Sequence, residues 1–238
     1  MTHGTVGAGR LQTDEDVRRP SWGKLLGEAP ALLRLLAAQL RRPKVQEEIG
    51  RGRAVVVIPA FLANDLPTSF LRRTLRACGF HACGWGKGLN LGANAKKFSQ
   101  LLARIEELAE TSGAPVALIG WSLGGLYARE LARRRPDAVS AVVTLGTPFS
   151  QGLRANNAWK LYEAINDHDV DHPPVRVQPN VKPPVRTVAL WSRRDGIVAP
   201  ASARGAEGEA DERVELHCRH NEMVSHPEAL RAILTVLS

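Results

Sequence analysis

The chain has 238 residues, of which 44% are hydrophobic and 24% charged, and its formal net charge is +8. These values are typical of a folded globular domain and exclude a long disordered chain. Arginine and lysine are spread along the whole sequence without a zinc-finger or RNA-binding signature. The charge therefore predicts a solvated surface and no nucleic-acid partner.

The predicted elements alternate after a polar, glycine-containing start over residues 1–20. Residues 21–42 have a helical pattern that Pro30 is expected to split. Short apolar, β-branched runs then alternate with amphipathic helices, which predicts a parallel sheet covered on both faces. The expected strands cover 54–58, 80–85, 116–119, 139–145, 185–191 and 214–217. The expected helices cover 65–77, 94–111, 122–134 and 226–237.

This pattern divides the chain into an N-terminal tail and helical segment, 1–45, and an α/β domain, 46–238. Residues 150–184 interrupt the alternation with two Pro-Pro pairs and several Asp, Asn and His residues. Such a long interruption in a compact domain is typical of a lid or binding segment. We therefore expect a small cap insertion at about 150–184.

No apolar run is long enough to span a bilayer, and the first 20 residues lack the apolar core of a signal peptide. With only three cysteines, these features predict a cytoplasmic, reduced protein, although a Cys78–Cys83 bridge stays open. The leucines of residues 31–40 form one apolar helix face. This face is expected to cover the core, and weak contact with a membrane surface is the alternative.

The strongest motif is Gly120-Trp121-Ser122-Leu123-Gly124, a G-x-S-x-G pentapeptide. It lies between an expected buried strand and an expected helix, which is the setting of a nucleophile elbow. A sharp strand-to-helix turn of this kind exposes the serine hydroxyl above the sheet and requires small residues around it. Ser122 is therefore the candidate nucleophile, and a glycine-rich turn with a capping serine is the alternative.

A serine nucleophile needs a base and an acid, which follow it in the order Ser, acid, His in this setting. Asp195 comes directly after the late strand and is the candidate acid, although Asp-Gly is also a common turn. His220 is favoured as the base because it lies in the loop before the last helix. His217, at the end of a strand, and His226, at the start of that helix, are the alternatives.

Two backbone N–H groups are expected to form an oxyanion hole. The N–H of Leu123 follows the nucleophile and lies at a helix N-terminus, where the potential is positive. The second donor should come from the loop after the strand 54–58. Phe61 is the preferred residue there, and Leu62 is the alternative.

With these residues in place, the chain resembles bacterial α/β-hydrolases that are esterases or lipases. The resemblance runs from about residue 24 to the end and rests on VVVIPAFLAND, GWGKGLNLGANA, LIGWSLGGLYARELARR, VVTLGTPF, LWSRRDGIVAP and RANNAWKLYE. It departs from the family in two places. Ala60 stands where the oxyanion loop usually has glycine, and the last loop reads His220-Asn221-Glu222 instead of His-x-Gly.

The resemblance implies an α/β-hydrolase fold with a mostly parallel central sheet, helices on both faces and a cap. It implies hydrolysis of a carboxylic ester, from a small molecule or a lipid, without a cofactor. An apolar acyl pocket is expected between cap and sheet, and the same aromatic residues would otherwise be ordinary core. The candidate substrate-binding residues are Leu62, Trp121, Phe149 and Trp159, with Phe61 and Leu161 beside them.

Other functions stay open at this stage. A thioesterase or acyltransferase would use the same three residues, and a non-catalytic binding protein could keep the same fold. The acidic and histidine-rich run 167–172 does not fit a calcium loop, and we predict a solvated cap loop instead of a metal site.

Overall fold

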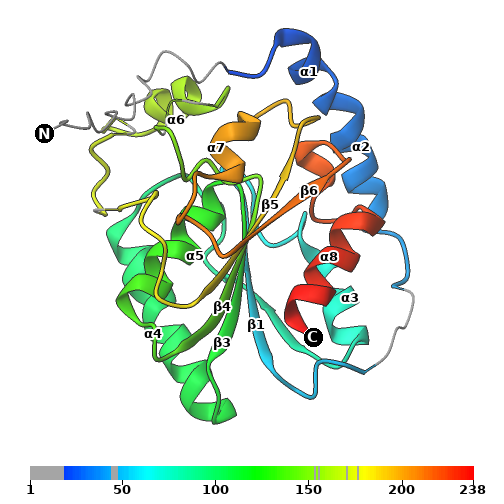
Figure 1. Ribbon diagram of the computed structural model, residues 1–238, viewed down its shortest axis with the longest axis vertical. Helices are drawn as coiled ribbons and strands as arrows, with labels where there is room; N and C mark the ends of the chain where they lie inside the picture. Colours follow the sequence, from blue (N-terminus) through cyan, green and yellow to red (C-terminus); the bar gives the residue numbers. More distant parts are fainter. Residues whose placement is uncertain (1–18, 44–47, 153, 155, 170, 176) are drawn as a thin grey trace, which may run out of the picture.

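The computed structural model describes residues 19–43, 48–152, 154, 156–169, 171–175 and 177–238. These residues form a six-stranded parallel sheet in the order β2-β1-β3-β4-β5-β6 (Figure 1). The strands are β1 (Ala54–Ile58), β2 (His81–Gly84), β3 (Val116–Trp121), β4 (Val139–Leu145), β5 (Arg186–Ser192) and β6 (Glu212–Leu216). Each of the six predicted strands is present, with ends that differ by a few residues or fewer.

Helices cover both faces of the sheet, as the alternation predicted. Helices α4 (Ala95–Ser112) and α5 (Leu123–Arg134) lie on one side, and α3 (Ser69–Ala77) and α8 (Pro227–Leu237) lie on the other (Figure 1). Three short elements were not predicted as separate helices: α6 (Trp159–Ile165), α7 (Pro200–Arg204) and the 3₁₀ turn η2 (His220–Glu222). Helix α6 lies between β4 and β5, α7 between β5 and β6, and η2 between β6 and α8.

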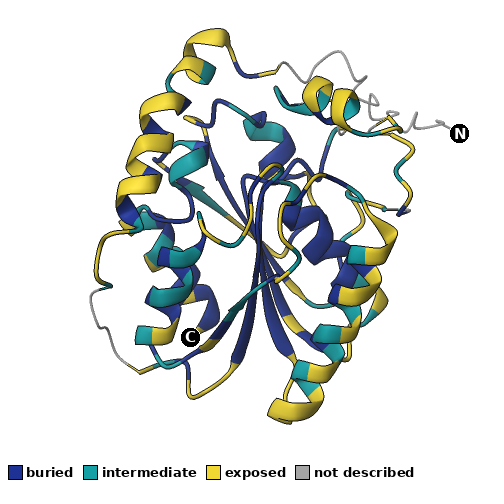
Figure 2. Cartoon of the chain, turned by 180° about the vertical axis from the view of Figure 1, so that it is seen from behind, coloured by how far each residue is buried: buried dark blue, intermediate teal, exposed yellow. Residues whose placement is uncertain are grey.

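The buried core forms two layers because side chains alternate across each strand. In β1, Val55 and Val57 join the layer beneath α3 and α8, whereas Val56 and Ile58 join the layer beneath α4 and α5. Figure 2 shows the inner strands mostly buried, whereas the edge strands β2 and β6 and the outer faces of the helices carry exposed residues. A strand buried on both faces explains the continuous apolar runs in the sequence.

The N-terminal helical segment contains two helices, α1 (Trp22–Leu26) and α2 (Glu28–Ala38). The expected break at Pro30 was wrong: the helices separate at Gly27, and Pro30 is the third residue of α2. Proline is tolerated in the first turn of a helix because the N–H groups there have no intrahelical acceptor. The proposed boundary near residue 45 stays a prediction, and most of the polar start over residues 1–20, which was expected to be loose, lies outside the described residues.

Helix α2 has a buried face and an exposed face. Ala31, Leu35 and Ala38 are buried against the domain. Leu33, in contrast, is 68% exposed and Leu40, just beyond the helix, is 89% exposed. The apolar stripe over 31–40 therefore covers the core on one side and leaves leucines in solvent on the other.

The segment expected as a cap contains α6 and irregular chain. It is joined to the loop after β5, because Asn157 donates from its backbone N–H to the Ile197 carbonyl and from its side chain to the Gly196 carbonyl. Cys78, Cys83 and Cys218 are all thiols, so no disulfide joins Cys78 to Cys83. Among the described helices, none combines the length and the apolar character needed to cross a bilayer.

Candidate active site

Ser122 lies at the sharp turn between β3 and α5 with φ 53° and ψ −121°. This positive φ is rare for a residue with a side chain and is found where surrounding contacts hold it in place. The Ser122 N–H donates to the Leu145 carbonyl of β4 at 2.8 Å, and the Ser122 carbonyl accepts from the Gly125 N–H at 2.9 Å. The turn is therefore fixed to the neighbouring strand and to its own helix.

The glycines of the pentapeptide are required by close backbone approach. A side-chain carbon on Gly120 would overlap the backbone of Gly125, and one on Gly124 would overlap the carbonyl of Ile58. Gly125, beyond the pentapeptide, packs in the same way against the Thr147 side chain. These contacts bring α5 close to the carboxyl ends of β1, β3 and β4, where the serine lies.

Asp195 and His220 form a buried pair at the same end of the sheet. Asp195 follows β5 and His220 opens η2, and the His220 Nδ1 lies 2.7 Å from the Asp195 Oδ2. The other carboxylate oxygen, Oδ1, accepts the backbone N–H groups of Ile197 and Val198, each at 2.8 Å. The carboxylate is thus held in one orientation with its charge fully hydrogen-bonded, which a buried charge requires.

Two effects oppose each other at the His220 ring. Burial acts to lower the pKa of His220, whereas the charge and hydrogen bond of Asp195, and then the charge of Glu28, raise it above its ordinary value. Gly146, with φ 56°, packs against the pair. A side-chain carbon there would lie 2.9 Å from both Asp195 Oδ2 and His220 Nδ1. The pair is therefore enclosed by protein.

The structure distinguishes the three candidate histidines. His217 is exposed and its Nδ1 lies 2.8 Å from Glu228 Oε1, while His226 lies near the same carboxylate at 3.9 Å. His220 is the histidine that lies against Asp195. Its ring centroid is also 6.0 Å from that of Trp121, the residue before Ser122, which places His220 next to the turn that carries the serine.

Two backbone amides are available beside Ser122. Leu123 is the first residue of α5, and the first N–H groups of a helix have no intrahelical acceptor. In the described part of the chain, the Phe61 N–H has no backbone acceptor either. The alternative donor is different, because the Leu62 N–H donates to the Asn90 carbonyl at 2.8 Å. That bond also holds the loop after β1 next to the loop after β2.

A cavity of about 50 Å³ opens beside Ser122, between the sheet and the segment expected as a cap. Trp159 lines it, as the sequence predicted for a pocket residue. Phe61, Ser122, Leu123, Tyr162 and Val198 are among the other lining residues. An apolar cavity of about 40 Å³ lies next to it and shares Leu123, Leu126 and Tyr162 with it.

Four predicted pocket residues are not part of that lining. Leu62 is 42% exposed outside the cavity, and Leu161 is on the exposed side of α6. Phe149 is buried beneath the guanidinium of Arg129, at 4.1 Å from its ring centroid. Trp121 is buried in the core beside His220, so for Phe149 and Trp121 the alternative of ordinary core describes their surroundings.

Sequence reasoning missed Tyr162 and Glu28. Tyr162 lines both cavities, and its hydroxyl accepts from the Ala93 N–H at 3.1 Å. Burial raises the pKa of that phenol. Glu28 accepts hydrogen bonds from the backbone N–H of Gly196, the residue after Asp195, and from the backbone N–H of His220. A tyrosine in a cap and a glutamate in a helical pattern carry no sequence signal of these positions.

The run 167–172 has its own internal contacts. His168 bonds the Tyr162 hydroxyl at 2.9 Å, and His172 bonds Asp169 at 3.0 Å. Within the described ranges, no group of three or more His, Cys, Asp or Glu side chains is arranged to hold a metal ion.

Known proteins share this architecture. A family model described as alpha/beta hydrolase fold matches residues 92–172. Among solved structures, lipase B of Aspergillus fumigatus aligns with a TM-score of 0.56 and 16% identity over 85% of this chain and 56% of that lipase. A metagenome-derived lipolytic enzyme aligns with a TM-score of 0.58 and 15% identity over 83% of this chain and 99% of that enzyme.

A third structure, the naproxen esterase (carboxylesterase NP) of Bacillus subtilis, aligns with a TM-score of 0.55 and 13% identity over 90% of this chain and 98% of that enzyme. The chain thus spans little more than half of the Aspergillus lipase and nearly all of the other two. At these identities the likeness concerns the fold. With the six-stranded parallel sheet and the covering helices, it confirms the predicted fold class: the chain has an α/β-hydrolase fold.

Proposed function

We propose that the protein hydrolyses carboxylic esters through an acyl-enzyme formed on Ser122, with His220 as base and Asp195 as acid. The observation that carries the proposal is the buried 2.7 Å contact between His220 and Asp195 beside a strained serine at a cavity. A serine at such a turn, with a histidine–aspartate pair near it, is the arrangement that nucleophilic catalysis uses. Lipolytic and esterase structures of the same fold support this reading.

In the first half-reaction, His220 Nε2 takes the Ser122 hydroxyl proton while Oγ attacks the ester carbonyl carbon. Asp195 holds the ring with Nδ1–H directed at its own oxygen and stabilises the imidazolium that forms. The N–H groups of Leu123 and Phe61 are proposed to bind the oxyanion of the tetrahedral intermediate. Collapse of that intermediate transfers the proton from His220 to the leaving alcohol and leaves an ester on Ser122.

In the second half-reaction, a water molecule loses its proton to His220 and attacks the acyl carbon. The intermediate then releases the carboxylic acid and returns the hydrogen to Ser122. An alcohol or amine in place of water would make the protein an acyltransferase, and a thioester in place of the ester would make it a thioesterase. The acceptor and the leaving group, rather than the three residues, distinguish these reactions.

Substrate size is set in this proposal by the cavity that Trp159 and Tyr162 line. A ligand pocket for a drug-sized molecule usually encloses about 300 to 1,000 Å³. A cavity of about 50 Å³ is much smaller, so we expect short acyl groups to react fastest. The adjacent apolar cavity is the direction in which a longer chain would extend.

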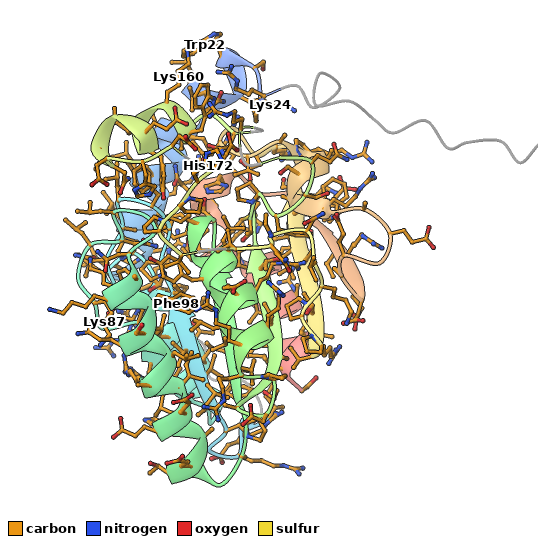
Figure 3. The ribbon with its side chains drawn as sticks, turned by 90° about the vertical axis from the view of Figure 1, so that its left-hand side faces the viewer. Trp22, Lys24, Lys87, Phe98, Lys160 and His172 are labelled. Atoms are coloured by element: carbon orange, nitrogen blue, oxygen red, sulfur yellow. The ribbon has the colours of Figure 1, made fainter. Side chains whose placement is uncertain are left out.

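The proposal also covers contact with lipid and the location of the protein. The exposed leucines of α2 are proposed to make weak contact with a lipid surface, and Trp22 on α1 is also 80% exposed. Figure 3 shows Trp22, Lys24 and Lys160 at the same end of the molecule. A cytoplasmic location is part of the proposal, because thiols persist in reducing compartments.

The test is an assay of the purified protein and of Ser122→Ala with p-nitrophenyl esters from acetate to palmitate. We expect turnover of the short esters, and loss of roughly three or more orders of magnitude in kcat for the variant. Ester turnover that is unchanged in Ser122→Ala would contradict the proposed nucleophile. Absence of turnover by the intact protein, with retained folding, would favour a thioester substrate or a binding protein.

A further inference from the structure

Glu28 is a charged residue in a place where charge is expensive. It is the first residue of α2, and only 4% of its surface is exposed. A carboxylate removed from water to that extent is stable only when hydrogen bonds replace its hydration. The hydrogen-bond donors to the Glu28 carboxylate therefore indicate its role.

Those partners are backbone N–H groups from two separate loops. Glu28 Oε1 accepts from Gly196 at 2.9 Å and from His220 at 3.1 Å. Glu28 Oε2 accepts from Asn221 at 3.1 Å. Gly196 follows Asp195 in the acid loop (193–198), and His220 and Asn221 lie in the base loop (219–222). One carboxylate thus bridges the segments that carry the acid and the base.

The junction around Glu28 is closely packed. A side-chain carbon on Gly196 would overlap the Lys24 carbonyl and lie 2.9 Å from Glu28 Cγ, and one on Gly27 would overlap the Arg219 guanidinium. The glycines allow α1 and α2 to approach both loops closely enough for direct hydrogen bonds.

We propose that Glu28 is a positioning residue for the reaction: its carboxylate holds the acid loop and the base loop at the separation where Asp195 and His220 bond. The inference rests on the serine-hydrolase function proposed above. Glu28 contacts the loop backbones instead of the reacting atoms, so it acts through His220 and Asp195. It also adds a second negative charge near the imidazole.

The other charged residues of α1, α2 and the two loops are Lys24, Arg34, Arg193, Arg194, Arg219 and Glu222. Arg34 and Glu222 form an ion pair at 2.7 Å, and Arg219 donates to the Lys24 carbonyl at 3.2 Å. Lys24 donates to the Arg193 carbonyl at 2.9 Å, and Arg193 pairs with Glu215 at 2.8 Å. Asp195 and Glu28 are the carboxylates whose charges raise the pKa of His220, so removal of the Glu28 charge should lower it.

The test compares Glu28→Gln, Glu28→Asp and Glu228→Gln with the intact chain in steady-state assays across pH. Glutamine has no charge and keeps only one acceptor oxygen. Its NH₂ group would face a backbone N–H, so two donors would meet without an acceptor. We expect kcat to fall up to about 10²-fold with little change in KM, because a small displacement of the base suffices for such a loss. The acid limb of the kcat/KM profile should move to lower pH.

Glu28→Asp keeps the charge on a shorter side chain. It should lose kcat while its acid limb stays near that of the intact chain, which separates position from charge. Glu228→Gln is the matched control: it removes a carboxylate that binds the His217 N–H and contacts neither loop backbone. It should change neither kcat nor the limb. Wild-type kcat and an unmoved limb in Glu28→Gln would overturn the proposal.

A substrate-free measurement separates this proposal from the ester hydrolysis itself. Histidine side-chain NMR titration, with the His220 signal assigned by its loss in His220→Asn, should give a lower His220 pKa in Glu28→Gln than in the intact chain. An unchanged pKa overturns the electrostatic part even if no ester is turned over. If Glu28→Gln fails to fold by circular dichroism, full kcat in folded Glu28→Asp overturns the positioning role.

Discussion

Ser122 has a backbone conformation that residues with side chains usually avoid, and the molecule holds it there through three glycine contacts and a hydrogen bond to β4. Strained conformations of this kind cost of order 1–3 kcal/mol and persist where the surroundings fix them. The carboxylate of Asp195 is also held in place, since each of its oxygens takes part in hydrogen bonds. Contacts within the protein thus fix the Ser122 backbone and the Asp195 carboxylate without a substrate.

The pH dependence follows from His220. Because the general base must be neutral to accept the Ser122 proton, kcat/KM should fall as pH drops through the raised pKa of His220. Asp195→Asn removes the main influence that raises this pKa, so the acid limb should move to lower pH. We also expect kcat to fall about 10⁴-fold, because the amide no longer fixes the ring tautomer.

Asp137→Asn is the control for that profile, since Asp137 is exposed and pairs with Arg135 at 2.8 Å. It should leave rate and limb unchanged. A limb at the same pH in Asp195→Asn and the intact chain would show that His220 is not the titrating base.

At the scale of elements, the hydrophobic pattern of the sequence identified the strands that pack between two layers of helices. The buried runs of β1, β3 and β4 were recognisable because both faces of these strands are covered. The break between α1 and α2 was placed at Pro30 instead of Gly27. Gly27 packs against the guanidinium of Arg219, and the two residues are 192 positions apart, so nothing local to the helices marks this contact. The role of α2 over the two loops has no local signature for the same reason.

Helix α2 also provides the test of lipid contact. Deleting residues 1–45 would remove buried Leu35 and Glu28 together with the exposed leucines, so substitution is the cleaner change. The triple variant Leu32→Ser, Leu33→Ser and Leu36→Ser alters side chains that are 45%, 68% and 48% exposed. Liposome flotation should decrease for this variant while p-nitrophenyl acetate turnover is retained, because apolar area drives interfacial binding.

A matched change elsewhere controls for general loss of apolar surface. Leu66→Ser and Leu89→Ser together alter exposed leucines of the loops after β1 and β2. Equal flotation of the α2 variant and the intact chain would remove α2 as the lipid contact.

For the whole molecule, the fold was predictable, and so was the placement of Ser122, Asp195 and His220 at one edge of the sheet, because parallel strands bring their carboxyl ends to one edge. The residues that line the pocket were harder to predict from the sequence. Trp159 and Phe149 are both aromatic and both follow β4, yet Trp159 lines the cavity and Phe149 lies beneath Arg129. Which aromatic reaches the serine depends on how the segment after β4 folds back over the sheet, and sequence alone does not specify that path.

The cavity between this segment and the sheet predicts substrate size. Trp159→Ala should enlarge it and move the chain-length optimum of the ester panel from short toward longer acyl groups. Leu161→Ala is the matched control from the exposed side of α6 and should leave the optimum unchanged. An optimum that stays at the same length in Trp159→Ala would show that the acyl chain binds elsewhere.

The central claim is that Ser122 is the nucleophile, and covalent trapping tests it most directly. The folded chain would be treated with a p-nitrophenyl alkylphosphonate, which transfers its phosphonyl group to an activated serine, and then digested for peptide mass mapping. We predict one adduct per chain on Ser122, together with loss of ester turnover, and no adduct in Ser122→Ala or His220→Asn. An adduct on another residue, or labelling that is equal in Ser122→Ala, would contradict the assignment.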